Sequence, residues 1–222
     1  MFNRFSLALA VVMIGMASAT IPASAGVITD LFNTGVDAFG VALPGGDGVT
    51  DPHYTVASST IGAVVGSNAV TYKHPLYFPN SATSRWVSNS SDGSPGNGIV
   101  TFQTTFDLTG FDPASASISG LWGVDNVGEI FLNGSDTGIG LLFGFPAFES
   151  LHAFAINSGF ISGINTLAFE ITDEGPPLAF RVEGIVGTAD AAAVPEPSTI
   201  ALLAAALLSL LGLGAMRRRA GG

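Results

Sequence analysis

The ten residues from Gly98 to Asp107 constrain the fold of this chain more than any other segment. Their residues alternate between two faces, and Val100, Phe102 and Phe106 fall on the same face. Because side chains of a β-strand point to opposite sides with a period of two, this pattern predicts a half-buried strand. We expect its Val-Phe-Phe face to lie in a hydrophobic core.

Similar β-rich segments recur along the chain, separated by Asp-Pro, Asn-Gly, Asp-Thr-Gly and Gly-Pro-Pro turns. Most of the 29 glycines lie in the same region, where they would break helices but suit turns and bulges. Short strands spaced in this way predict an all-β fold, an antiparallel β-sandwich. The further strands that we expect are 54–58, 69–72, 86–87, 116–124, 128–132, 148–156, 165–172 and 178–186.

The central part of the chain is long enough for one domain and is strongly acidic. We assign residues 26–188 to the sandwich and residues 189–194 to a short linker. Only three basic residues lie in the central part, against 16 of the 17 acidic ones, giving a formal charge near −13. Such a large negative charge makes nucleic acid a poor partner. The chain has no cysteine, which excludes disulfides and thiolate sites.

The N-terminal 25 residues have the organisation of a secretory signal peptide. Arg4 supplies the positive charge, an apolar run extends over 5–16, and Ala23-Ser24-Ala25 provides a small-residue cleavage site before Gly26. The sequence therefore predicts export and a mature protein that begins near Gly26.

The C-terminal residues 195–222 combine three features in a fixed order. Pro195-Glu196-Pro197 is followed by an uncharged run over 200–216 and then by arginines at 217–219. At 1.5 Å per residue, 17 residues reach the lower end of the length needed to cross a bilayer. The arginine cluster would keep its end of the helix in the cytoplasm, which places the domain outside.

This order of features resembles the PEP-CTERM sorting signal of exported bacterial proteins. The resemblance implies a partner, an exosortase-type membrane peptidase that recognises Pro195, Glu196 and Pro197 as parts of its substrate. It also implies a protein that is transiently anchored in the inner membrane by its C-terminal helix and then passes to the cell surface or the medium. A permanent single-pass anchor is the alternative.

A second resemblance covers part of the domain. The segments Leu121–Gly134 and Phe160–Phe169 resemble the jelly-roll module of galactose-binding-like domains, in which an Asn-Gly hairpin precedes a Gly-x-Asn-x-Leu strand entry. The resemblance implies a jelly-roll sandwich. It names no ligand, because such domains bind sugars, lipids or proteins.

Two groups of residues are candidates for binding. Carboxylate and amide oxygens are the ligands that calcium prefers, although Asp and Asn also occupy turns for backbone reasons alone. Aromatic rings beside polar groups can stack on a sugar ring, although a buried ring belongs to the core. The calcium candidates are Asp125, Asn126, Glu129 and Asp136, and the ligand-binding candidates are His53, Tyr54 and Trp86.

No catalytic residues are predicted. The three histidines lack the spacing of a helical zinc site, and the sequence contains no nucleophile elbow, phosphate loop or dinucleotide motif. The favoured hypothesis is a non-enzymatic surface protein that associates with exopolysaccharide in a biofilm matrix. The alternatives are a structural or adhesive matrix protein without sugar binding, and a polysaccharide hydrolase or lyase. The last would need a cleft that joins His53 or His152 to Glu129 or Glu149.

Overall fold

The structure is a computed structural model that describes residues 25–93, 96–142, 147–193 and 206–207. Within these residues the chain forms eleven β-strands and one short 3-10 helix, η1. The elements are β1 (Ala25–Val27), β2 (Thr50–Ser59), β3 (Asn68–Thr71), β4 (Val87–Ser88), β5 (Gly98–Asp107), η1 (Pro113–Ser115), β6 (Ser117–Asp125), β7 (Val127–Leu132), β8 (Ser135–Leu141), β9 (His152–Ile156), β10 (Ile164–Asp173) and β11 (Ala179–Asp190).

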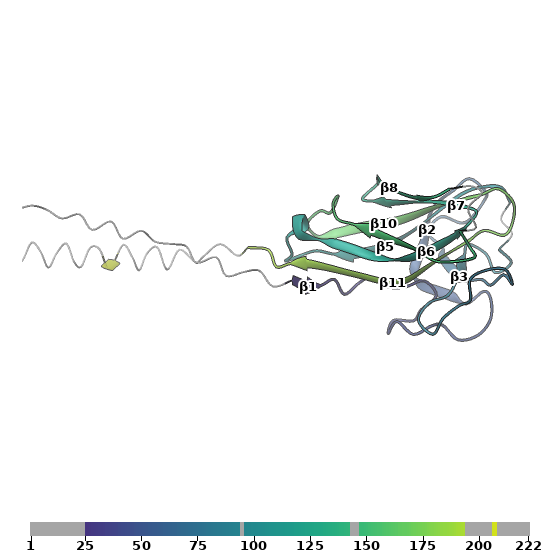
Figure 1. Ribbon diagram of the computed structural model, residues 1–222, viewed down its shortest axis with the longest axis horizontal. Coiled ribbons are helices and arrows are strands. Elements are labelled where there is room, and N and C mark those ends of the chain that lie inside the picture. The colour runs from purple at the N-terminus through teal and green to yellow at the C-terminus, as the bar shows by residue number, and fades with distance from the viewer. Residues whose placement is uncertain (1–24, 94–95, 143–146, 194–205, 208–222) are drawn as a thin grey trace, which may run out of the picture.

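Ten of these strands follow one hydrogen-bonded path that folds over into two layers, and β1 pairs with β11 off this path (Figure 1). The order is β8-β7-β10-β5-β2-β3-β4-β11-β6-β9, and every described pairing between named strands is antiparallel. Aromatic contacts join strands that lie far apart on this path. The ring centroids of Phe102 on β5 and Phe180 on β11 are 4.7 Å apart, and those of Trp122 on β6 and Phe169 on β10 are 5.9 Å apart. The sandwich core therefore lies between the two layers.

The predicted alternation of the Gly98–Asp107 segment is confirmed in β5. Val100, Phe102 and Phe106 are at most 1% exposed. β10 pairs with β5 along its entire length, and its own alternating residues Leu167 and Phe169 are fully buried. Two neighbouring strands thus present matched apolar rows to the core, as the period of two requires.

The Asn133-Gly134 pair forms the predicted hairpin turn between β7 and β8. Both residues have positive φ, 52° and 77°, which is the backbone that this two-residue turn needs. The Asn133 amide also donates to the Gly159 carbonyl and to the side chain of Asn165, each at 2.9 Å. The turn is thereby tied to the segment that enters β10.

A buried arginine holds the loop between β3 and β4 against β11. Arg181 is fully buried, donates from Nε to the Ser84 hydroxyl at 2.7 Å and bonds the Pro79 carbonyl. Its guanidinium also forms an ion pair with Glu183 at 2.7 Å. A buried charge is tolerated only when it is paired and hydrogen-bonded in this way.

Three features differ from the sequence-based expectations. β1 and β8 were not expected, because β1 has three residues and β8 is rich in glycine, so neither shows a clear alternation. The expected strand 148–156 begins only at His152. β11 continues to Asp190, and Ala192 still donates a backbone hydrogen bond to the Gly110 carbonyl, so the fold extends into the expected linker.

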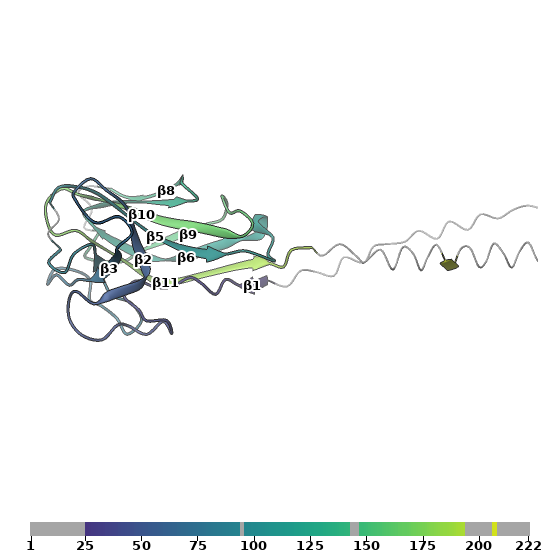
Figure 2. The ribbon, with the colours of Figure 1, turned by 180° about the vertical axis from the view of Figure 1, so that it is seen from behind.

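The first and last described strands lie side by side at one end of the domain (Figures 1 and 2). Ala25 pairs with Asp190, and Val27 pairs with Thr188. The expected signal peptide, apart from Ala25, and nearly all of the expected C-terminal helix lie outside the described residues. Among the residues that are described, no helix is long and apolar enough to cross a membrane.

We predict that F169A destabilises the domain by about 3–5 kcal/mol, because the ring is fully buried and its loss leaves a cavity. The matched control is F39A, since the Phe39 side chain is 90% exposed. This control should leave the free energy of unfolding within about 0.5 kcal/mol of wild type. Urea unfolding of the two variants measures both values, and equal destabilisation would contradict the two-layer core.

Candidate functional site

The three residues expected to bind a ligand do not form an exposed aromatic surface. Tyr54 and Trp86 are at most 1% exposed, so their rings belong to the core. The Tyr54 hydroxyl donates to the Phe32 carbonyl at 2.8 Å. The His53 ring stacks on the Phe32 ring with centroids 3.7 Å apart. Tyr54 therefore holds the backbone of Phe32 in place, and His53 packs against its ring.

The four residues expected to bind calcium do not lie together. The Asn126 amide donates to the Asp125 carboxylate at 2.7 Å, so these two are neighbours. Glu129 lies within β7, and Asp136 lies on β8 beyond the turn at the far end of β7. At about 3.3 Å per residue, β7 puts roughly 20 Å between Asp125 and Asp136. Among the described residues, no group of three or more His, Asp or Glu side chains could hold a metal ion.

Asp125 instead belongs to a buried polar cluster at the end of β6. The Tyr77 hydroxyl donates to its carboxylate at 2.8 Å. Burial raises the pKa of Asp125 to about 6, the Tyr77 hydrogen bond opposes this rise, and the charge of Asp173 adds to it. Asp173 is 2% exposed, its pKa is raised by burial, and its Oδ2 has no hydrogen-bond partner among the described residues.

An exposed aromatic surface is found at a place that the sequence analysis did not select. The Phe39 side chain is 90% exposed at the tip of the loop between β1 and β2. It borders a shallow hollow of about 370 Å³, which we call the aromatic shelf. The shelf is lined by Thr29, Leu31, Phe32, Asn33, Ala38, Phe39, Gly40 and Ile185.

The backbone under Phe39 is held by a dense set of hydrogen bonds to one residue. The Asp37 carboxylate accepts from the Phe39 and Val41 amides at 2.9 and 3.0 Å. The Asp37 carbonyl accepts from the Gly40 amide, and the Asp37 amide donates to the Val41 carbonyl. His53 contacts the same carbonyl through Nε2 at 3.0 Å. The exposed ring thus stands on a loop whose backbone is held in one conformation by these hydrogen bonds.

Asn33 also lines the shelf, but both the nitrogen and the oxygen of its side-chain amide are already hydrogen-bonded. Its nitrogen donates to the Thr83 carbonyl at 2.8 Å, and its oxygen accepts from the Ile185 amide at 3.0 Å. These bonds fix the shelf to β11 and to the loop before β4. The one sequence signal for this site is an aromatic residue between turn formers, Asp37-Ala38-Phe39-Gly40.

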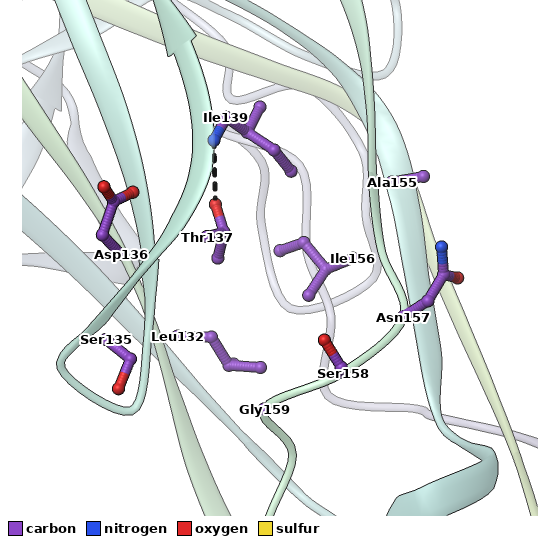
Figure 3. Close-up of a pocket in the computed structure, with 10 residues that line it drawn as sticks. All are labelled: Leu132, Ser135, Asp136, Thr137, Ile139, Ala155, Ile156, Asn157, Ser158 and Gly159. Atoms are coloured by element: carbon purple, nitrogen blue, oxygen red, sulfur yellow. Dashed lines mark hydrogen bonds between the residues drawn. The ribbon is translucent and has the colours of Figure 1, made fainter.

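A second hollow, of about 350 Å³, lies where the strand path ends (Figure 3). β8 and β9 are the two ends of that path, and residues of both line the hollow. Figure 3 shows Leu132, Ile139 and Ile156 directed into it, whereas the polar ends of Asp136 and Asn157 point away. The Ser158 hydroxyl also faces the hollow, so its lining is a mixture of apolar and polar groups.

The residues considered for a hydrolase do not meet in either hollow. His53 packs on Phe32, and a ring nitrogen of His152 lies 3.2 Å from the Ser150 hydroxyl. Neither histidine lines the two hollows, and neither does Glu129 or Glu149.

The raised pKa of Asp125 generates a pH-dependent prediction. Because the folded state binds this proton more tightly than the unfolded chain, the group stabilises the fold below about pH 4. That contribution is lost as the pH rises through about 6. D125N mimics the protonated carboxyl, since its amide can donate to Tyr77 while its oxygen still accepts from Asn126.

We therefore expect D125N to melt about 3–6 °C above wild type at pH 7.5 and to match it near pH 4. Thermal melts across this range measure the difference, with N157A as the control for a solvent-exposed amide. A constant difference between D125N and wild type at all pH values would show that folding does not raise the pKa of Asp125.

Comparisons with known proteins concern the fold of the domain and the sequence of the tail. A Stig cyclase, Fisc from Fischerella sp. TAU, is 11% identical, covers 77% of this chain and 100% of its own, and has a TM-score of 0.45. A CBM35 from Paenibacillus barcinonensis is 11% identical, with 64% and 98% coverage and a TM-score of 0.35. A family 35 carbohydrate binding module from an environmental isolate is 13% identical, with 66% and 98% coverage and a TM-score of 0.33.

No curated protein matches the chain. The C-terminal residues, which include Pro195, Glu196 and Pro197 and lie almost entirely outside the described part, do match a family. Residues 193–219 match the PEP-CTERM protein-sorting motif. The chain thus carries a PEP-CTERM sorting motif at its C-terminal end, as the order of its tail features predicts.

Proposed function

We propose that this protein is a non-enzymatic, exported component of the extracellular matrix whose sandwich domain binds exopolysaccharide. The sorting motif supports the export part, because it implies processing by an exosortase and delivery to the cell surface. Processing near Pro195–Pro197 would remove the C-terminal helix and release or transfer the domain. The acidic, cysteine-free domain is then the part that acts outside the cell.

One observation carries the binding part of the proposal, the exposed ring of Phe39 on a fixed loop. An aromatic face left in water binds the apolar C–H face of a sugar ring, because both surfaces are then dehydrated together. The shelf adds Phe32 as further apolar surface, above the buried Ile185, and Thr29 as a hydroxyl partner at the border. A shallow, open hollow suits a stretch of polymer better than a small molecule, which needs an enclosed pocket.

Because both native tryptophans are buried, a tryptophan introduced on the shelf can report on binding by its fluorescence. Trp86 and Trp122 are each 1% exposed, so their fluorescence should respond little to a ligand on the surface. F39W places an exposed indole on the shelf and keeps an aromatic face there. Polysaccharide from the native host should shift and intensify the emission of F39W while leaving that of wild type almost unchanged.

We predict that F39A loses retention on immobilised host polysaccharide by about ten-fold or more, as expected for an aromatic anchor. The control V64A removes an exposed apolar side chain elsewhere, since Val64 is 71% exposed, and should be retained as wild type is. Equal retention of F39A and wild type would remove the shelf from the proposal. Absence of retention for wild type would favour the structural or adhesive matrix protein, and turnover of the polymer would favour a hydrolase or lyase.

A further inference from the structure

The sorting motif begins almost at the surface of the folded domain. The last described backbone hydrogen bond runs from the Ala192 amide to the Gly110 carbonyl at 2.8 Å, and Ala191 bridges to Phe111. Three residues further on is Pro195, and three residues of extended chain span at most about 11 Å. Pro197 is within about 18 Å by the same measure.

A peptidase that grips this segment cannot avoid the domain. A small protein domain is about 30 Å across, which is larger than the whole reach of the spacer. The peptidase must therefore touch the end of the sandwich from which the chain leaves. We call this end the terminal pole and define it by Val27, residues 108–112 and residues 159–164.

The segments that form this pole are linked to one another by backbone hydrogen bonds. Asp112 donates to the Asp190 carbonyl at 2.8 Å, and Leu108 donates to the Gly163 carbonyl at 2.9 Å. The same loop therefore touches both the exit of the chain and the segment before β10. β1 lies at this end too, beside the end of β11 (Figures 1 and 2).

The terminal pole exposes apolar side chains that the fold does not use. Val27 is 67% exposed, Ile161 is 51% exposed and Ile164 is 61% exposed. Exposed aliphatic side chains beside a surface that a partner must contact are typical of an interaction surface. We propose that the terminal pole is the docking surface for the membrane peptidase that reads the sorting motif, with Ile161 and Ile164 as its main contacts. This inference rests on the processing in the proposed function and is independent of sugar binding.

The test is the rate at which the full-length chain is converted to its processed form in the native host. I161S/I164S should slow this conversion by about three- to ten-fold, as expected when interface contacts are truncated. V64S/V65S is the matched control, because Val64 and Val65 are 71% and 63% exposed in the loop between β2 and β3. The control should be processed as fast as wild type. V27S, on β1, provides a second variant of the pole, should I161S/I164S fold poorly.

A longer spacer between the domain and the sorting motif distinguishes two possibilities: the peptidase docks on the terminal pole, or the terminal pole obstructs the peptidase. Six Gly and Ser residues inserted after Ala193 let the peptidase reach the motif without touching the pole. The insertion should slow processing to the level of I161S/I164S, and adding it to I161S/I164S should have no further effect, since both remove the same contact. Faster processing with the insertion would show that the pole obstructs the peptidase, and the docking proposal would be wrong.

Three other results would also overturn the proposal. Normal processing of folded I161S/I164S and V27S would show that the pole makes no useful contact. Binding of the processed wild-type protein, but not of I161S/I164S, to vesicles of host lipids would assign the surface to the bilayer. If wild type itself is not cut, the sorting step fails, and this outcome is distinct from a failure of sugar binding.

Discussion

The contact of Phe169 with the opposite layer is the interaction on which the rest of the fold depends. Its ring meets Trp122, Phe154 and Phe180 of the facing layer, with centroids 5.9, 6.4 and 5.4 Å away. Offset and edge-on aromatic pairs add specific geometry to the burial of a large apolar surface. The chain has no cysteine and therefore no disulfide between its layers. The contacts among these four aromatic rings therefore fix the distance between the layers and the positions of the strands that carry the rings.

Once the layers are fixed, the loops gain rigid supports. Arg181 pins the loop before β4 to β11, and Asp37 holds the loop that carries Phe39. Both devices place a charged or polar side chain where backbone groups would otherwise lack partners. The result is an ordered surface built from irregular segments, and it is on such loops, supported by a rigid scaffold, that binding residues are most often found.

The sequence predicted the fold better than the site, for a physical reason. The β5 alternation and the Asn133-Gly134 turn are local patterns, and the structure confirms both. Exposure, in contrast, depends on which distant segments cover a ring. Tyr54 and Trp86 were selected because polar residues lie beside them in the sequence, yet both are at most 1% exposed. The calcium candidates lie apart for a similar reason, because the length of β7 separates residues that are near in sequence. β8 escaped prediction because its glycines hide the period of two.

The pairing of β11 with β6 has a mechanical consequence. β11 is the last described strand before the sorting motif, and its residues from Ala179 to Thr188 are paired with β6 in an antiparallel ladder that is interrupted between Glu183 and Val186. A pull on the chain beyond Asp190 would act along β11, perpendicular to these hydrogen bonds. Many bonds would then carry the load at once instead of breaking one by one. The strand that ends the fold is thus placed to resist shear when the chain is pulled from its C-terminal side.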